Sequence, residues 1–383
     1  MNRPIRVMML GLRSFPGVQG GVETHAEHLC PLLVERGCDV TVLVRSPYHQ
    51  AATGTEWKGV KFVKLWAPKS KTLEAIVHSF LGVLYAGFSR PDILHIQAIG
   101  PSIMTLPARL MGLRVVVTHH GPDYDRQKWG RFARFVLQLG ERWGARWSSG
   151  RIVISKVIAD LVRSKHGVEP ELIPNGVVLP KLLDSIGTLE KFGLTRGRYV
   201  LLVSRLVPEK RHLDLIAAFQ QAHLPGWKLA FVGGSDHPDA YQREVIKKAA
   251  EAGVVMTGFQ QGSALQELYS HAGLFVLPSS HEGLPIALLE ALSYGLMVLA
   301  SDIPANLEVG LPAEHYFPLG NVDALADKIR QQSSNGLTLA ARESIRAWVA
   351  QRYDWQDIAE KTVKLYANCM SRNRPDPIVK SPS

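Results

Sequence analysis

The stretch HEGLPIALLE at residues 281–290 places two carboxylates, Glu282 and Glu290, eight positions apart around a glycine, a proline and an apolar run. Proline is favoured at the first position of a helix. We therefore expect Glu282 on a loop just before a helix and Glu290 about two turns inside it. The unpaired N–H groups of a first helical turn bind anions well. The stretch favours a phosphorylated, polyhydroxylated ligand such as a nucleotide sugar; the alternative is a capped amphipathic helix with one surface acid.

Strand and helix signals alternate on both sides of this stretch. In the second half of the chain, apolar runs predict strands at residues 199–203, 228–232, 254–256, 274–277 and 297–300. Helices are predicted between them at about 209–222, 238–252, 263–270 and 284–294. Apolar strands separated by helices are typical of βαβ units, in which a parallel sheet is covered on both faces.

The first half repeats this pattern, with strands predicted at 5–10, 39–44, 93–96, 115–118, 152–155 and 172–174. A turn-rich segment leads into a helix from about Val22 to Arg36, which Gly37 ends. We therefore expect an α/β chain with two Rossmann-like units. Ligands of such sheets bind beyond the carboxyl ends of the strands, so two facing sheets would hold them in a central cleft.

A chain of 383 residues with 46% apolar and 20% charged residues suits two folded domains. A weakly periodic segment, 178–198, is the predicted linker, and a last helix begins near Trp355. No apolar run is long enough to span a bilayer, and the longest, Ile76–Phe88, predicts a buried helix. The start of the chain has no signal-peptide pattern. Three cysteines without CxxC spacing favour reduced thiols and a cytoplasmic protein.

The net positive charge is confined to the first half. Residues 1–178 contain 23 Lys and Arg against 13 Asp and Glu, whereas the rest of the chain is balanced. Many of these cations alternate with aromatic residues, in one patch from Trp57 to Lys71 and in a second from Lys128 to Trp147. Surfaces that bind anionic membranes have this composition. Nucleic acid would attract the same charges, but no nucleic-acid motif accompanies them.

Four segments with residues suited to ligand binding or catalysis each follow a predicted strand. Pro16–Glu23 is glycine-rich and begins a helix, so a ligand can approach its backbone. Thr118–Gly121 offers two histidines at a strand end, where structural histidines are also common. Ser204–Lys210 carries Arg205 and Lys210, a pair suited to a diphosphate or simply to solvated surface charge. The fourth segment is the stretch with the paired glutamates.

Together these segments resemble the retaining nucleotide-sugar glycosyltransferases of family 4, which have the GT-B fold. The resemblance covers nearly the whole chain, and Pro174–Gly176 adds to it. It implies an acceptor-binding domain at 1–178 and a nucleotide-sugar domain at 179–354, with the last helix, about 355–372, crossing back to the first domain. The segment Thr118–Gly130 is similar to members that build bacterial O-antigen or exopolysaccharide.

The resemblance also implies roles for individual residues. Arg205 and Lys210 would neutralise the diphosphate leaving group, Glu282 would contact the donor sugar, and Glu290 would bind the ribose. His120 would lie near the reactive carbon of the sugar, with His119 as the alternative one position away. The other implied donor contacts are the backbone of Gly21, Gly283 and Leu284 and a base pocket shaped by Gly233, Gly234, Gly258 and Phe259.

Charge development explains why such a site needs cations. Departure of the leaving group builds negative charge on the diphosphate, which Arg205, Lys210 and helix amides would stabilise without a metal ion or other cofactor. Asp123 and Asp125 form a D-x-D pattern, but we do not expect a metal there. The donor would be a UDP-, GDP- or dTDP-linked hexose or deoxyhexose, and the acceptor a polyprenyl-diphosphate-linked glycan at the inner membrane face.

Three other functions are alternatives to this one, and the sequence gives a reason against each. A dinucleotide-dependent oxidoreductase lacks support, because no G-x-G-x-x-G follows the first strand and Arg45 stands where an acid is expected. A GT-B-like nucleotide-sugar epimerase would not need a basic, aromatic first half. A non-catalytic membrane scaffold would not need Arg205, Lys210, Glu282 and Glu290 together.

Overall fold

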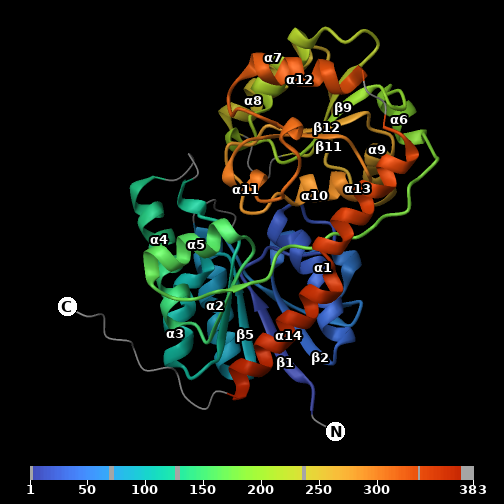
Figure 1. Cartoon of the computed structure of the whole chain (residues 1–383). Helices are drawn as coiled ribbons and strands as arrows, with labels where there is room; N and C mark the ends of the chain where they lie inside the picture. The colour runs from blue at the N-terminus through green and yellow to red at the C-terminus, as the bar shows by residue number, and fades with distance from the viewer. Residues whose placement is uncertain (1–2, 69–72, 126–129, 235–238, 335–336, 372–383) are drawn as a thin grey trace. The chain divides into compact units, whose positions relative to one another are not determined.

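The computed structural model describes residues 3–68, 73–125, 130–234, 239–334 and 337–371, which form two compact α/β units (Figure 1). The first unit holds the described residues up to Val18, Val22–Pro174 and the segment from Trp355. The second holds Asn175–Asp354 together with Gln19–Gly21. The division of labour between an acceptor domain and a nucleotide-sugar domain stays a prediction.

The first unit is built on an eight-stranded sheet with the order β3-β4-β2-β1-β5-β6-β7-β8. All neighbours pair in parallel except β3 and β4, which form an antiparallel edge. The strands are β1 (Ile5–Leu10), β2 (Cys38–Arg45), β3 (Glu56–Trp57), β4 (Val60–Leu65), β5 (Ile93–Gln97), β6 (Val115–His119), β7 (Gly150–Val153) and β8 (Glu171–Leu172).

Helices cover this sheet, and the last helix of the chain is one of them. They are α1 (Gly21–Glu35), α2 (Leu73–Ser89), α3 (Thr105–Leu110), α4 (Arg131–Trp147), α5 (Lys156–His166) and α14 (Trp355–Ser371). Ile358, Ala359 and Tyr366 of α14 join one buried cluster with residues of α1, β1 and β2. This cluster holds α14 beside α1 (Figure 1), although more than 300 residues separate them in the sequence.

The second unit has a six-stranded parallel sheet with the order β11-β10-β9-β12-β13-β14. Its strands are β9 (Tyr199–Val203), β10 (Lys228–Val232), β11 (Val255–Gly258), β12 (Leu274–Leu277), β13 (Val298–Ser301) and β14 (Tyr316–Phe317). Its helices are α6 (Gly187–Phe192), α7 (His212–Ala222), α8 (Ala240–Glu251), α9 (Gly262–Ser270), α10 (Ile286–Ser293), α11 (Pro304–Leu307), α12 (Val322–Ser334) and α13 (Leu339–Arg352).

Each sheet contains one point where the strand order reverses. In the first unit β1 lies between β2 and β5, and in the second β9 lies between β10 and β12. Loops diverge beyond the carboxyl ends of the strands at such a point and leave room for a ligand. The predicted site residues follow these strands or their neighbours: the glycine-rich segment follows β1, the histidine pair β6, Arg205 and Lys210 β9, and Glu282 β12.

One edge of the first sheet was not predicted from the sequence. Residues 56–65 form β3 and β4, so the first basic and aromatic patch is partly a strand pair. Phe62 is buried, and both Trp57 and Phe62 pack edge-on against the ring of Phe15. The ring of Phe62 therefore belongs to the core and is not a membrane contact, because alternate residues of β4 face the core. Lys69, Lys71, Lys128 and Trp129 of the two patches lie outside the described residues.

The apolar segment predicted as a buried helix is α2, but only one side of it is covered. Val83 and Ala86 pack into the core, whereas Phe80 and Phe88 are exposed. None of the helices in the described ranges is both long enough and apolar enough to cross a membrane.

Candidate active site

The loop before α10 presents backbone donors. Pro285 is the N-cap, and its carbonyl accepts the N–H groups of Leu288 at 3.0 Å and Leu289 at 3.1 Å. In the described part of the chain, the N–H groups of Gly283, Leu284, Ile286 and Ala287 have no protein acceptor. An array of free amides at a helix start is an anion-binding arrangement.

The position of Glu290 differs from the expectation. It is the fifth residue of α10, just over one turn inside the helix instead of about two, because the proline caps the helix and the first helical residue is Ile286. The hydroxyl of Tyr269 donates to Glu290 Oε2 at 3.0 Å and orients the half-buried carboxylate. Tyr269 in turn stacks on Tyr294, with ring centroids 4.9 Å apart.

Lys210 and Glu282 are brought together although 72 residues separate them. Lys210 ends a short 3-10 turn, Pro208–Lys210, and its ammonium forms an ion pair with Glu282 Oε1. The Ser280 N–H donates to the Glu209 carbonyl at 2.8 Å and holds the two loops side by side. A lysine that already faces the start of α10 is placed to neutralise a charged ligand there.

Backbone hydrogen bonds gather the remaining loops of the second unit at the same edge of its sheet. Leu206 donates to the Gly234 carbonyl at 2.9 Å, and Gly233 donates to the Gly258 carbonyl at 2.8 Å. Gly233 has φ +134°, and a Cβ there would collide with the Ser204 carbonyl oxygen. Close approach of these chains therefore requires glycine.

Two of the predicted binding residues in these loops are partly open to solvent. Arg205 is half-buried, two residues beyond β9. Phe259 follows β11, and 45% of its surface is exposed. A large exposed aromatic ring is available for stacking on a planar ligand.

The two histidines beyond β6 have different surroundings. His119 is buried: its Nε2 faces Glu141 Oε1 at 3.2 Å, and its Nδ1 accepts the N–H of Gly121 at 3.1 Å. His120 is half-buried, and its Nε2 lies 2.8 Å from Gln97 Oε1. Protein groups satisfy both ring nitrogens of His119, so His120 is the better candidate for a ligand contact.

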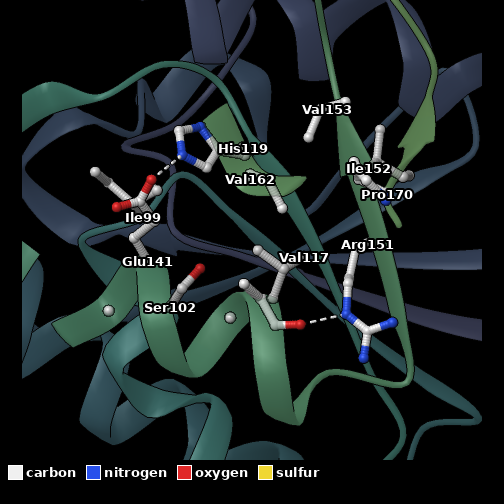
Figure 2. Close-up of a pocket in the computed structure, with 13 residues that line it drawn as sticks. Ile99, Ser102, Val117, His119, Glu141, Arg151, Ile152, Val153, Val162 and Pro170 are labelled. Atoms are coloured by element: carbon white, nitrogen blue, oxygen red, sulfur yellow. Dashed lines mark hydrogen bonds and ion pairs between the residues drawn. The ribbon is translucent and has the colours of Figure 1, made fainter. Parts of the chain in front are cut away.

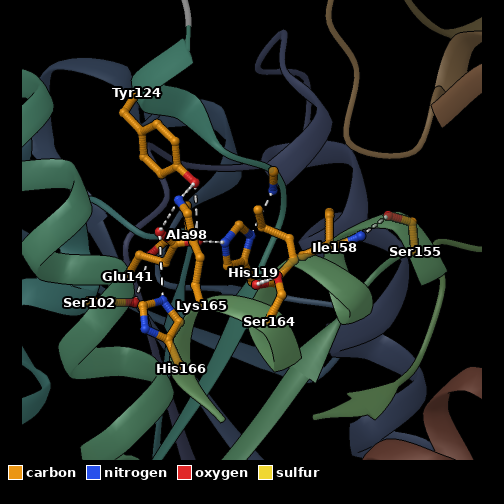
Figure 3. A network of polar contacts seen from close by, with 12 residues as sticks. Ala98, Ser102, His119, Tyr124, Glu141, Ser155, Ile158, Ser164, Lys165 and His166 are labelled. Atoms are coloured by element: carbon orange, nitrogen blue, oxygen red, sulfur yellow. Dashed lines mark hydrogen bonds and ion pairs between the residues drawn. The ribbon is translucent and has the colours of Figure 1, made fainter. Parts of the chain in front are cut away.

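Glu141 is the centre of a buried polar network (Figure 3). Besides His119, it accepts a hydrogen bond from the Tyr124 hydroxyl at 3.2 Å and lies 3.4 Å from the ammonium of Lys165. Burial alone would raise the pKa of Glu141, but the hydrogen bond of His119 and the nearby His166 and Lys165 hold it well below its ordinary range. The network anchors the loop that follows the histidine pair to α4.

The pocket between α4, β6 and β7 is too small for a sugar (Figure 2). Its lining includes Val117, His119, Glu141 and Arg151, but its volume of about 20 Å³ holds a water molecule and no sugar. The helix lies close to the sheet here because α4 carries glycine at the contact: a Cβ at Gly140 would collide with the Ile99 carbonyl.

The remaining predicted residues lie on the surface. Gly21 is exposed and is the first residue of α1. Asp123 and Asp125 flank the buried Tyr124 in a 3-10 turn. In the chain as far as it is described, no group of three or more His, Cys, Asp or Glu is arranged to hold a metal ion.

Comparison with known proteins identifies the family of this chain. A profile described as "Glycosyltransferase Family 4" matches residues 19–180, and one described as "Glycosyl transferases group 1" matches residues 189–348. The chain belongs to the family 4 glycosyltransferases. It is a retaining glycosyltransferase that moves a sugar from a nucleotide sugar.

Two relatives illustrate the family. A GDP-mannose:cellobiosyl-diphosphopolyprenol alpha-mannosyltransferase of Xanthomonas campestris is 26% identical over 376 residues, which cover 90% of this chain and 96% of the relative. A UDP-Gal:alpha-D-GlcNAc-diphosphoundecaprenol alpha-1,3-galactosyltransferase of Escherichia coli is 29% identical over 233 residues, 56% of this chain and 59% of the relative.

Solved structures show the same fold. Sucrose-phosphate synthase from Thermosynechococcus elongatus superposes with a TM-score of 0.77 at 20% identity, over 96% of this chain and 99% of that one. Anabaena HepE in complex with UDP-glucose gives 0.76 at 17% identity, over 95% and 99%. The GT-B fold expected from the sequence is confirmed.

Sequence reasoning missed Gln97, Glu141 and Tyr366. Gln97 and Glu141 contact the histidine pair, and the Tyr366 hydroxyl lies 2.6 Å from Nδ1 of His95, which in turn contacts Thr118 of β6. Nothing in the local sequence marks them, because each acts on a residue at least 22 positions away.

Proposed function

We propose that the second unit binds the nucleoside-diphosphate sugar at the edge of its sheet that carries Lys210, Glu282 and the start of α10. The observation that carries this proposal is the coincidence of one ammonium group with four free amides, a combination that fits a diphosphate. Arg205 supplies the second cation. Glu290, already oriented by Tyr269, binds the ribose, and Phe259 stacks on the base.

The same groups account for catalysis. As the glycosidic bond breaks, negative charge grows on the departing diphosphate and positive charge on the sugar ring. Lys210, Arg205 and the amides of Gly283 and Leu284 stabilise the first, and they do so best in the transition state, where the charge is largest. Glu282 contacts the donor sugar, and His120 is proposed as a further sugar contact.

A thermal-shift panel tests the donor site. We expect one of UDP, GDP and dTDP to raise the melting temperature with saturation, whether or not EDTA is present, because a ligand of the native state stabilises it by mass action. Lys210→Met should abolish this shift, whereas Lys247→Met, at a lysine whose side chain is 75% exposed on α8, should retain it. Equal shifts in both variants would place the diphosphate elsewhere, and a shift that needs metal would contradict the metal-free mechanism.

We further propose that the acceptor is a growing bacterial polysaccharide, of the O-antigen or exopolysaccharide kind, carried on a polyprenyl diphosphate. The two relatives named above act on sugars linked to diphosphoundecaprenol and diphosphopolyprenol. The excess of positive charge in residues 1–178 suits an anionic acceptor of this kind. Transfer from the donor identified above to a synthetic farnesyl-diphosphate-linked disaccharide, detected by mass spectrometry, is the expected result.

Such an acceptor requires the enzyme to work at the cytoplasmic face of the membrane, and α4 is the proposed contact. Phe132 and Phe135 are 78% and 60% exposed, and Arg131 and Arg134 beside them are exposed as well. Aromatic rings enter the interface between lipid headgroups and acyl chains, while arginines bind the anionic headgroups.

Liposome flotation tests this contact. The protein should bind vesicles that contain phosphatidylglycerol and not vesicles of phosphatidylcholine alone, and the double change Phe132→Ser and Phe135→Ser should remove the binding. Leu339→Ser, at a residue that is 83% exposed on α13, is the matched control. Binding that ignores lipid charge, or that survives the α4 changes, would contradict the proposal.

The family assignment disfavours the other functions considered from the sequence. A dehydrogenase, an epimerase and a non-catalytic scaffold would each leave the sugar transfer typical of the family unexplained. Release of nucleoside diphosphate from the donor, with the sugar appearing on the acceptor, separates transfer from all three.

A further inference from the structure

Gln97 lies where it can control His120. It is the last residue of β5, is fully buried, and pairs in register with Thr118 on the neighbouring strand β6. His120 follows two residues later, and its Nε2 is 2.8 Å from Gln97 Oε1. The contact joins the ends of two neighbouring strands next to the point where the order of the first sheet reverses.

The orientation of the Gln97 amide follows from its other neighbour. Its Nε2 group points to the sulfur of Met9 at 3.5 Å, and Met9 is fully buried. A thioether can accept a weak hydrogen bond and cannot donate one. The opposite orientation would set the amide oxygen against the sulfur without a proton between them. The carbonyl of Gln97 therefore faces the histidine, and a carbonyl only accepts.

This contact fixes the tautomer of His120. Nε2 must carry the proton that Gln97 accepts, so Nδ1 of the neutral ring carries the lone pair. Among the residues that the structure describes, none forms a hydrogen bond to Nδ1. Burial, followed by the charges of His119 and His95, lowers the pKa of His120 to about 3, and the ring of His25 packs edge-on against it. The ring is neutral at physiological pH.

His119 provides a contrast within the same segment. Its Nδ1 is occupied by the Gly121 amide, and its Nε2 faces the carboxylate of Glu141. His120 faces an uncharged amide instead. Neighbouring histidines are thus held by partners of different charge, and only His120 has a nitrogen left for a substrate.

We propose that Gln97 is a positioning residue that presents His120 to the substrate as a neutral imidazole whose Nδ1 accepts a hydrogen bond from a sugar hydroxyl. The neutral partner has a second consequence. Positive charge develops on the donor sugar in the transition state, and an imidazolium beside it would raise the barrier. This inference rests on the role proposed above for His120, and it goes further by naming the protonation state and the group that sets it.

Nitrogen NMR of the histidine rings tests the tautomer without any substrate. Protein labelled with ¹⁵N-histidine should show His120, assigned from its loss in His120→Ala, as the Nε2–H form from pH 6 to 8. Gln97→Met, which fills the same space and contacts Met9, should give a mixture of tautomers. The matched control Gln332→Met replaces another buried glutamine, on α12, and should leave the spectrum of His120 unchanged.

Kinetics on the donor found in the thermal-shift panel, assayed by release of nucleoside diphosphate, complete the test. A partner that orients a functional histidine is typically worth about 10- to 100-fold, so Gln97→Met should lower kcat by that amount with little change in KM. Gln97→Glu should keep the Nε2–H tautomer but raise the pKa of His120. Its kcat should therefore fall as the pH is lowered from 9 to 6, where the wild-type rate is flat.

The outcomes distinguish the proposed role of Gln97 from the proposed role of His120 on which it rests. An Nδ1–H tautomer in the wild type, or an unchanged tautomer and kcat in Gln97→Met, would overturn the role of Gln97. A normal kcat in His120→Ala, with the expected tautomer in the wild type, would instead remove His120 from the site and leave the tautomer assignment intact.

Discussion

The candidate site residues of the two units are held in opposite ways. In the second unit the chemical groups are charged and lie on loops and the start of α10, and Lys210 and Glu282 form a half-buried ion pair. In the first unit the groups are neutral or buried, and His120 is positioned by Gln97 behind it. One half presents charge to a ligand, whereas the other half controls the protonation of a ring.

This difference reflects the charge that each half meets in the proposed reaction. In the proposed reaction the second unit binds a diphosphate that becomes more negative, so its cations and free amides lower the barrier directly. His120 is the proposed contact of the sugar, on which positive charge appears. A neutral ring with a fixed lone pair suits that task, and burial supplies the neutrality because it disfavours the charged form of histidine.

Removal of Lys210 should have the largest effect, because it deletes charge where the charge develops. Loss of one preorganised donor to a transition-state anion typically costs about 10²- to 10³-fold in rate, so we expect a fall of that size in kcat for Lys210→Met. Steady-state release of nucleoside diphosphate measures it. Lys247→Met is the control, and a rise in KM with an unchanged kcat would mean that Lys210 binds the ground state and the transition state equally.

Much of the fold could be predicted because the strands are apolar and buried on both faces. Strands β1, β9, β10 and β12 have the predicted bounds, and their helices follow at the expected spacing. The pair β3 and β4 was missed because Val60–Leu65 carries two lysines, Lys61 and Lys64, among its apolar residues and so resembles a charged surface. The short strand β14, Tyr316–Phe317, carries no periodic signal.

The two halves of the site differ in the same respect. Arg205 with Lys210, and Glu282 with Glu290, lie within ten residues of each other, so a local pattern carries them. The surroundings of His120 depend on Gln97 of another strand, and those of its neighbour His95 on Tyr366 of the last helix. Contacts of this kind arise from strand order and helix packing, which no local spacing encodes.

Mild acid should destabilise the first unit more than the second. Burial lowers the pKa of His28 and His78 to about 4 and that of His95 and His120 to about 3, whereas in the second unit only His212 is lowered as far among the described residues. The unfolded chain takes up protons as the pH falls below about 6.5, while the folded chain does not. Stability is therefore lost from pH 6.5 downward, by about 1 kcal/mol per histidine between pH 6.5 and 5.5.

Hydrogen exchange measures this difference within one molecule. After correction for intrinsic rates, protection of the β5 amides should fall more steeply between pH 6.5 and 5.5 than protection of the β10 amides. His95→Gln removes one of the four titrating groups and should reduce the slope of the first unit alone. Parallel slopes in the two units would mean that these histidines are protonated in the folded state.

Tyr366→Phe probes the link between α14 and the first sheet. The hydroxyl lies 2.6 Å from Nδ1 of His95, in a fully buried position. Its removal leaves one buried polar atom without a partner, so we expect a loss of about 1–3 kcal/mol in the free energy of unfolding. Urea denaturation measures this loss. The exposed change Tyr85→Phe on α2 is the control, and similar midpoints for the two variants would show that the contact does not stabilise the first unit.

The smallest effect is expected at Phe259, the one large aromatic ring among the proposed donor contacts. An aromatic stacking contact is worth about 0.5–1.5 kcal/mol, so Phe259→Ala should weaken nucleoside diphosphate binding by about two- to tenfold and leave kcat unchanged. Isothermal titration measures the affinity, and Phe259→Tyr should restore it because the ring remains. Stacking is indifferent to charge, so the loss should persist at high salt, where binding through Lys210 weakens. If the affinity lost in Phe259→Ala shrank at high salt as much as the affinity lost in Lys210→Met, this division between stacking and charge would be contradicted.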